Sequence, residues 1–160
     1  MSEIKFLPTY QIASGRLKKK ERDYEIEFWD DRDPRYKEKK GETTTYIFRK
    51  TRPCNINLGT MKIQKRGDTF RLIDNHHKVA FAVVSYFHRS YADVEIETDE
   101  HYRRKGYATI LFGWVSDWLT SQGYIHESTC DIKNEASLKM HQKLGFEIAG
   151  HIRWAKKENK

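Results

Sequence analysis

The chain has 160 residues and a formal net charge of +7, with 33% charged and 13% aromatic residues, which suits one globular domain and excludes a disordered chain. No apolar run approaches the roughly 20 residues of a membrane helix. Met1–Tyr10 lacks the features of a signal peptide, so we expect a cytoplasmic protein that does not enter a membrane. The charge favours polyanionic ligands, such as a phosphorylated cofactor, RNA or a membrane surface, without choosing among them.

The first 55 residues are predicted to be rich in strands. Apolar residues alternate with glutamates over Tyr24–Phe28, which predicts a strand ending near Asp30. The β-branched and aromatic residues of Thr43–Phe48 predict a second strand. The mixed-charge runs Lys18–Asp23 and Arg32–Lys40 are typical of solvated loops, and a nucleic-acid-binding strip is the alternative.

The next part of the chain predicts a meander of short strands. Alternating apolar residues over Ile56–Ile63 precede a turn at Lys65–Asp68 and a strand over Phe70–Ile73. Asn75–Lys78 is predicted to form a tight hairpin turn into Val79–Phe87, the most apolar strand of the chain.

Histidines and cysteines do not predict a metal site. His76 and His77 are adjacent but have no third ligand at usable spacing, so we expect a solvated turn. Cys54 and Cys130 lie far apart without Cys-x-x-Cys spacing. Two buried thiols are therefore expected, not a disulfide or a zinc knuckle.

The spacing of apolar residues changes near the centre of the chain. Strand-like alternation over Asp93–Glu97 gives way, after a turn with three cations, to a helical apolar period over Ile110–Leu119. Gly106 and Ala108 leave the backbone of the first helical turn uncovered by large side chains. Because free amides at a helix N-terminus attract phosphate, we predict a pyrophosphate on the amides of Arg104–Ala108. An ordinary strand-to-helix connection with a basic tip is the alternative.

The last third of the chain predicts a strand, a helix and a final strand. Gln122-Gly123 is a helix stop, and Tyr124–Ile132 returns to a strand pattern. Since a helix joins this strand to the one before the basic turn, the two should be parallel, with a right-handed connection. Asn134 is expected to cap a helix over Glu135–Leu144, and a final strand over Phe146–Trp154 should follow, interrupted at its glycine.

Two motifs occur in this order and at this spacing of elements. Residues 103–108 read Arg-Arg-Lys-Gly-Tyr-Ala, and residues 134–146 begin with Asn-Glu-Ala-Ser and end with Lys-Leu-Gly-Phe. The pair resembles the GNAT superfamily of acyl-CoA-dependent N-acyltransferases, in which Arg/Gln-x-x-Gly-x-Gly/Ala opens the central helix. The resemblance covers roughly Val79–Trp154, the expected acetyl-CoA-binding core of a single domain over residues 1–160, and it is weak before about residue 55.

The resemblance implies a mixed α/β (α+β) fold with a central, mostly antiparallel twisted sheet, one parallel and splayed strand pair, and flanking helices. It implies acetyl-CoA as co-substrate and no metal. The pyrophosphate would lie on the amides of the turn, and the pantetheine arm would pair with the strand before it. Asn134 would bond this arm, unless it serves only as a helix cap. The predicted cofactor-binding residues are Ile96, Thr98, Arg103, Arg104, Lys105, Gly106, Tyr107, Ala108, Thr109, Asn134, Ser137 and Lys143.

The implied chemistry is direct attack of an amine on the thioester, which needs a base for the amine and an acid for the departing thiolate. Asp93, Glu95 and Glu97 share one face of a strand unless a bulge intervenes. Glu97 is the predicted base, with Asp93 next, and solvated or salt-bridged carboxylates are the alternative. Where many family members place a tyrosine acid, this chain has His141. Histidine donates protons near neutrality, so His141 is the predicted acid, although some branches need none.

The resemblance therefore predicts an N-acetyltransferase that acts on a primary amine of a small molecule or protein. Two alternatives stay open: a basic RNA- or ribosome-associated binding module, and a GNAT-like protein that binds CoA without catalysis. Family members often build one wall of the acceptor pocket from two helices after the first strand, and residues 1–60 show no convincing pair. Neither the acceptor nor the choice between monomer and homodimer is predicted.

Overall fold

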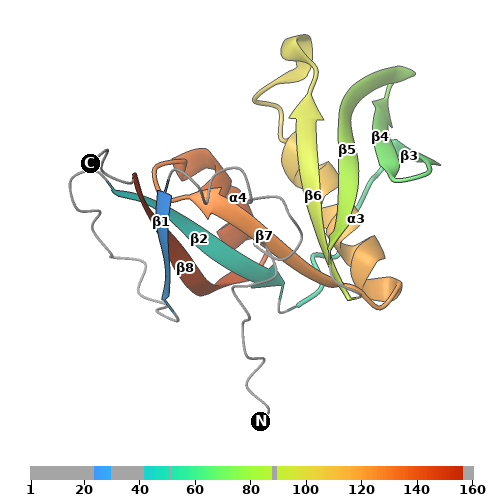
Figure 1. The fold of residues 1–160 in the computed structure, drawn as a ribbon. Coiled ribbons are helices and arrows are strands. Elements are labelled where there is room, and N and C mark those ends of the chain that lie inside the picture. Colours follow the sequence, from blue (N-terminus) through green and yellow to red (C-terminus); the bar gives the residue numbers. More distant parts are fainter. Residues whose placement is uncertain (1–23, 30–41, 51, 88–89, 157–160) are drawn as a thin grey trace.

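The structure is a computed structural model that describes residues 24–29, 42–50, 52–87 and 90–156. The described strands form an eight-stranded sheet in the order β1-β8-β2-β7-β6-β5-β4-β3 (Figure 1). The elements are β1 (Tyr24–Trp29), β2 (Glu42–Lys50), β3 (Lys62–Arg66), β4 (Thr69–Asp74), β5 (His77–Phe87), β6 (Tyr91–Thr98), a 3-10 helix (Glu100–Tyr102), α3 (Tyr107–Ser121), β7 (Ile125–Asp131), α4 (Glu135–Lys143) and β8 (Phe146–Lys156). Each neighbouring pair of strands is antiparallel except β6 and β7, which confirms the predicted mixed sheet.

Strands β6 and β7 meet only where each begins. Tyr91 pairs with Ile125 and Ala92 with His126, and the parallel pairing ends there. Beyond this point the strands diverge, and they form the two arms of a V in Figure 1. The turn that follows β6 lies at the open end of the V. The predicted splayed parallel pair is therefore confirmed.

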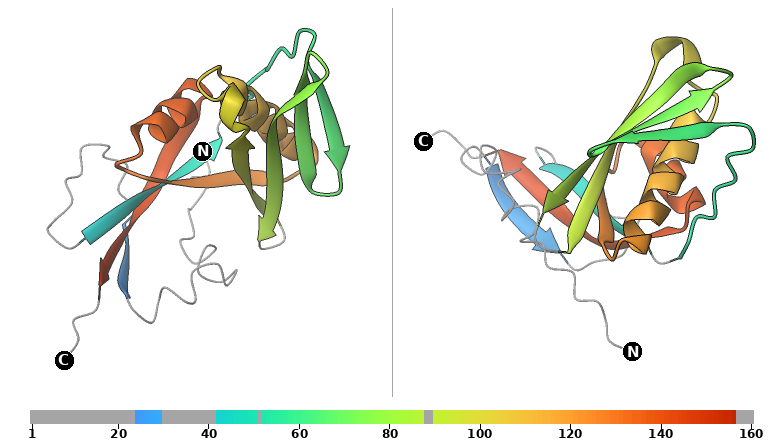
Figure 2. Two further views of the ribbon diagram at one scale, coloured as in Figure 1. Left: turned by 90° about the horizontal axis from the view of Figure 1, so that it is seen from above. Right: turned by 90° about the vertical axis from the view of Figure 1, so that its right-hand side faces the viewer.

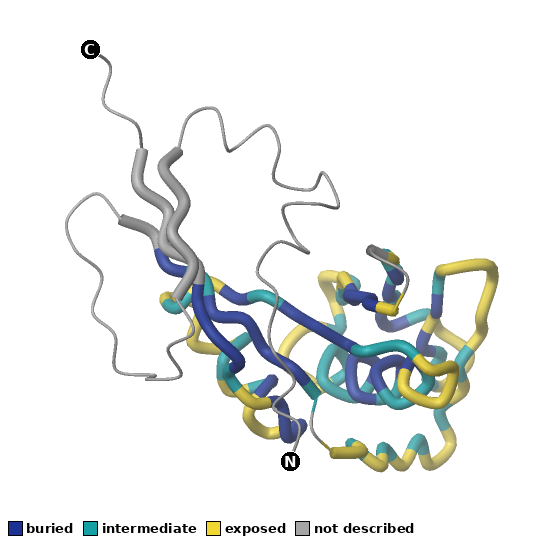
Figure 3. The backbone as a smooth tube through the Cα atoms, turned by 60° about the horizontal axis from the view of Figure 1, so that its bottom comes forward, coloured by how far each residue is buried: buried dark blue, intermediate teal, exposed yellow. Residues whose placement is uncertain are grey.

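The two α-helices of the described residues, α3 and α4, lie on the same side of the sheet (Figure 2). Helix α3 packs across β4, β5 and β6, and α4 packs against β8. The buried side chains of α3 recur every three or four residues and include Leu111, Phe112, Val115 and Leu119. Buried residues run along the central strands and the inner sides of the helices (Figure 3), so this interface is the core of the domain.

Strand β2 lies between β7 and β8, far from the strands that follow it in the sequence. One edge pairs with β7 and the other with β8. The register with β8 shifts between Ile47 and Phe48, opposite Gly150, where an interruption was predicted. Both predicted N-terminal strands are confirmed, and the charge runs Lys18–Asp23 and Arg32–Lys40 lie outside the described residues.

The segment between β2 and β3 is irregular, so the strand-like alternation predicted around Ile56 and Leu58 is wrong. Asn55 and Gly59 have φ angles of 53° and 58°, which a strand does not allow. Ile56 is instead apolar because it packs on α3, where a Cβ at Gly113 would lie 2.8 Å from its side chain. Residues 52–87 contain strands and turns but no helix.

The hairpin turn between β4 and β5 is shorter than predicted. Only Asn75 and His76 form it, with φ angles of 49° and 67°, while His77 and Lys78 already belong to β5. Two consecutive left-handed residues are the signature of a type I′ hairpin turn. Strand β6 likewise begins earlier than predicted, at Tyr91, because its first residues pair with β7.

Asp117 of α3 holds the irregular segment in place. Its carboxylate accepts hydrogen bonds from the amides of Cys54 and Asn55, both at 2.8 Å, and from the ammonium of Lys50. Burial acts to raise the pKa of Asp117, but the bonds donated by Lys50 and the two amides outweigh burial and hold that pKa below its ordinary value. One carboxylate thus ties β2, the irregular segment and α3 together.

We expect Asp117→Asn to lower the free energy of unfolding by about 2 kcal/mol near neutral pH, because three donors lose a charged acceptor. Since the pKa of Asp117 is lowered by folding, its contribution is present above the ordinary value of 3.8 and is lost as the pH falls through the folded value. Urea unfolding of both proteins at neutral pH and near pH 3 measures this. The difference in free energy of unfolding between the wild type and Asp117→Asn should be smaller near pH 3 than at neutral pH. An equal difference at both pH values would contradict the stabilising role assigned to the Asp117 carboxylate.

Candidate functional site

The turn after β6 presents open backbone amides. Arg104 and Gly106 both have left-handed φ angles, 65° and 80°, and left-handed residues in turns are a feature of backbone sites whose successive N–H groups bind anions. The first bond of α3 joins the Ile110 amide to the Gly106 carbonyl at 3.1 Å, so the amides of residues 107–109 have no acceptor within the helix. Residues 103–106 are exposed. The predicted pyrophosphate site therefore has accessible donors surrounded by cations.

Two tyrosines flank this turn. The ring centroids of Tyr102 and Tyr107 lie 6.2 Å apart, edge to face, and the Lys105 ammonium lies 5.8 Å from the Tyr102 ring. The Tyr107 hydroxyl donates to Asp74 at 2.5 Å, and this bond is the main cause that raises the pKa of Tyr107. The bond fastens the start of α3 to the end of β4.

Ile96 and Thr98 lie on β6 beyond the point where it leaves β7. On one edge they pair with Ala82 and Ala80 of β5. Pairing with β7 has ended by this point, so the other edge is not covered by β7. An extended ligand lying there would add to β6 as a partial strand, which is the role predicted for these residues.

The three carboxylates of β6 share one face, as alternation predicted. Asp93, Glu95 and Glu97 are opposite Ser85, Val83 and Phe81 in an unbroken register with β5, so no bulge separates them. Their surroundings nevertheless differ. Asp93 is 6% exposed and accepts a hydrogen bond from the Val94 amide at 2.7 Å, whereas Glu95 and Glu97 are exposed.

A buried histidine that belongs to neither motif, and that was not predicted from the sequence, faces Asp93. His126 of β7 places Nε2 3.5 Å from Asp93 Oδ1 and Nδ1 2.7 Å from Ser116 Oγ of α3. The sequence carries a signal for it, because residues 126–128, His-Glu-Ser, are three consecutive polar residues within a predicted strand. Polar residues in such a position need partners, and these partners come from distant parts of the chain.

A buried ion pair lies beside the same point. Arg49 of β2 donates to Glu127 Oε2 of β7 at 3.2 and 3.3 Å, and the two side chains are 6% and 0% exposed. Arg49 also lies 3.4 Å from the Tyr91 hydroxyl. Strand β2 therefore contributes a charged group to the divergence of β6 and β7, which its sequence alone did not indicate.

His141 lies in the core, 2% exposed, and stacks on Phe48 at 4.5 Å. Its Nδ1 is 2.7 Å from the Ser137 carbonyl, which only accepts, so Nδ1 carries the proton. Nε2 lies 2.8 Å from Ser128 Oγ, which then donates to it. Burial lowers the pKa of His141, an effect that the bond to Ser137 partly opposes. Both nitrogens already have partners, and its role as a general acid stays a prediction.

We expect His141 to remain neutral, with the proton on Nδ1, at pH values where an ordinary histidine is half protonated. Because folding lowers the pKa of His141, its contribution to stability is present above 6.5 and is lost as the pH falls through the folded value. Long-range proton–nitrogen NMR of the imidazole near pH 6.5 measures this state. A charged ring at that pH would contradict the geometry.

The predicted residues of α4 do not all lie together. Asn134 accepts a hydrogen bond from the Ser137 amide at 3.1 Å, so the helix-cap role is confirmed, while its amide nitrogen remains for another contact. Ser137 Oγ lies 3.4 Å from His141 Nδ1. Lys143 is exposed in the last turn of α4, roughly 12 Å along the helix from its start. The structure therefore separates Lys143 from the capping residues.

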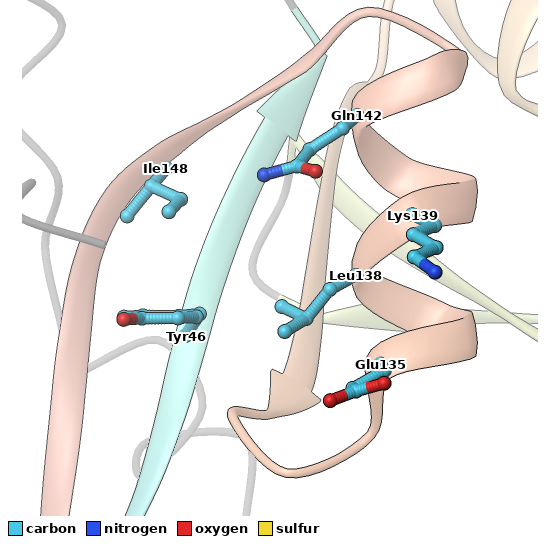
Figure 4. A pocket seen from close by; sticks show the side chains of 6 residues that line it. All are labelled: Tyr46, Glu135, Leu138, Lys139, Gln142 and Ile148. Carbon is cyan, nitrogen blue, oxygen red and sulfur yellow. The ribbon is translucent and has the colours of Figure 1, made fainter. Parts of the chain in front are cut away.

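A cleft lies between α4 and strands β2 and β8 (Figure 4). Its volume is about 210 Å³. Apolar side chains form its floor and polar side chains of α4 form its rim, and the lining residues are Tyr46, Glu135, Leu138, Lys139, Gln142 and Ile148. The predicted site residues do not line it.

The acetyltransferase (GNAT) family model matches residues 16–146. The chain belongs to this family. The match extends further toward the N-terminus than the two motifs do, and the family uses acetyl-CoA. A search of the curated proteins found no match. Within the described residues, no helix is long and apolar enough to cross a membrane, and no group of three His, Cys, Asp or Glu side chains is arranged to hold a metal ion.

Solved GNAT structures share the fold. A protein assigned to the GNAT family from Novosphingobium aromaticivorans superposes with a TM-score of 0.58 at 13% identity, over 84% of this chain and 74% of its own. A GNAT acetyltransferase from Colwellia psychrerythraea gives 0.58 at 14% identity, over 72% and 56%. A GCN5-related N-acetyltransferase from Kribbella flavida gives 0.55 at 10%, over 95% and 65%. The chain thus spans less than two thirds of the last two, and such low identities show the fold alone.

Proposed function

We propose that the protein transfers the acetyl group of acetyl-CoA to a primary amine by direct attack of the amine on the thioester. The observation that carries this proposal is the position of the open amides of residues 103–109 at the mouth of the splayed β6–β7 pair. Membership in the GNAT family supports it. Acetyl-CoA would supply the activated acyl group.

The residues present fit this co-substrate. The left-handed conformations of Arg104 and Gly106, in an exposed turn that leads into the N-terminus of α3, suit the binding of a diphosphate by backbone N–H groups. The cations of residues 103–105 add positive charge outside it. Ile96 and Thr98 offer backbone groups to an extended arm, and the amide nitrogen of Asn134 offers a donor from the start of α4.

The carboxylates of β6 supply the candidate bases. Glu97 lies nearer the open end of the V, and Asp93 lies at the point of divergence. A base must be within hydrogen-bond reach of the ammonium proton that it removes. His141 is the candidate acid by its position in the motif. Its ring is buried, however, and both ring nitrogens are already hydrogen-bonded, which supports a reaction in which the departing thiolate takes its proton from water.

The proposed function is tested with a panel of primary amines, including polyamines, amino sugars and lysine-containing peptides, with acetyl-CoA and detection of free thiol. We expect amine-dependent thiol release that saturates with increasing concentration of either substrate. Mass spectrometry should show the amine heavier by one acetyl group. Binding of acetyl-CoA by calorimetry, with no thiol release from any amine, would favour the alternative of a CoA-binding protein without catalysis. Absence of acetyl-CoA binding would refute the site.

A further inference from the structure

Asp93 occupies the first position beyond the last paired residues of β6 and β7. Ala92 still pairs with His126, and Asp93 follows where the strands separate. Its side chain is 8% exposed, whereas Glu95 and Glu97 on the same face are exposed. A carboxylate shielded from water acts more strongly on a nearby charge than a solvated one does. Of the three carboxylates, Asp93 is therefore the one whose charge interacts most strongly with neighbouring groups.

His126 approaches this carboxylate from the other arm of the V. Its Nε2 makes no hydrogen bond among the described residues, and its side chain is 0% exposed. The carboxylate within ion-pair distance is that of Asp93, 3.5 Å away. A closer approach of about 0.5 Å would make a full hydrogen bond, and such contacts often tighten only when substrate is bound.

The ring of His126 is held so that Nε2 faces Asp93. Its Nδ1 lies 2.7 Å from Ser116 Oγ, and Ser116 is 0% exposed. Phe112 and Phe146 flank the ring with centroids 5.0 and 5.1 Å away. When the Ser116 hydroxyl donates to Nδ1, the proton resides on Nε2, which then donates toward the carboxylate.

We infer that His126 is a positioning residue that orients Asp93 as the base for the amine acetylation proposed above, and this inference rests on that function. Asp93 takes a proton from the acceptor ammonium, and the freed nitrogen lone pair forms a bond to the acetyl carbonyl carbon. The carbon–sulfur bond breaks as the thiolate leaves, and the second proton that the nitrogen loses on becoming an amide passes through water to the thiolate. His126 donates a hydrogen bond from Nε2 that holds the Asp93 carboxylate toward the amine, while Ser116 sets the tautomer.

The test uses the amine that gives the highest rate in the thiol-release panel. We expect Asp93→Asn to lower kcat at least about 100-fold. His126→Phe keeps an aromatic ring between Phe112 and Phe146 but removes the donor, and we expect kcat to fall on the order of 10- to 100-fold with little change in the KM for acetyl-CoA. His126→Gln restores an N–H donor and should recover part of this loss. The double variant of Asp93→Asn and His126→Phe should be no slower than Asp93→Asn alone.

Three outcomes would overturn the inference while leaving the proposed function intact. They are wild-type kcat in His126→Phe, losses that multiply in the double variant, and a loss in Glu97→Gln that exceeds the loss in Asp93→Asn. His151→Phe is the control for burying phenylalanine in place of histidine, because His151 is 0% exposed on β8, two strands from β7. It should keep the wild-type kcat. A wild-type protein that acetylates no amine would overturn the proposed function and the inference together.

Discussion

Gly106→Glu is expected to weaken acetyl-CoA binding at least about 100-fold, because a carboxylate close to a bound diphosphate opposes it by several kcal/mol. Gly106 also has a φ angle of 80°, where a side chain adds strain of about 1 kcal/mol. A Cβ added at Gly106 would meet no atom within 4 Å, so a steric clash within the protein would not explain a loss of binding. Isothermal titration calorimetry with acetyl-CoA measures the loss.

Gly123→Glu is the matched control for this variant. Gly123 lies just beyond the other end of α3, has a φ angle of 88°, and likewise leaves an added Cβ in open space. Both variants thus carry the same charge and similar backbone strain. Only Gly106→Glu should lose binding. Equal affinities in the two variants and the wild type would refute the pyrophosphate site.

Arg49→Met is expected to lower the free energy of unfolding by about 3–5 kcal/mol, because it leaves the charge of Glu127 in the core without its guanidinium. The Glu127 side chain is 0% exposed, so water does not replace the lost partner. For a domain of this size the loss corresponds to a fall of roughly 6–20 °C in Tm. Thermal unfolding followed by circular dichroism measures it.

The double variant of Arg49→Met and Glu127→Met separates the cost of the stranded charge from the contribution of the pair. Replacing a whole buried ion pair by apolar side chains is often neutral or stabilising. We therefore expect the double variant to be more stable than Arg49→Met alone. A double variant that is less stable than the single one would show that the two residues act mainly through packing.

Elements with a strong local pattern were predicted well. The apolar period of α3 arises from one buried face and β5 is apolar along most of its length, so both are visible within a short window of sequence. The segment around Ile56 misled because packing against Gly113 also selects apolar residues, without any strand. The place of β2 between β7 and β8 depends on pairing between distant segments, which no local pattern encodes.

In the candidate site, too, the features encoded by a local pattern were predicted, and those that depend on contacts between distant segments were not. The open amides after β6 follow from a short motif and a local backbone conformation, so residues 103–108 sufficed to predict them. The contact between Asp93 and His126 needs two strands that meet only at their beginnings, and it appears only in the fold. His141 shows the converse: a motif position predicted an acid, while burial and two hydrogen bonds give its ring a structural setting.

Amide hydrogen exchange with and without saturating acetyl-CoA tests most directly the claim that this co-substrate lies between the arms of the V. We predict slower exchange at the amides of residues 103–109 and along β6 near Ile96 and Thr98. Unchanged exchange in the turn, or slowing confined to the cleft between α4 and strands β2 and β8, would contradict the account.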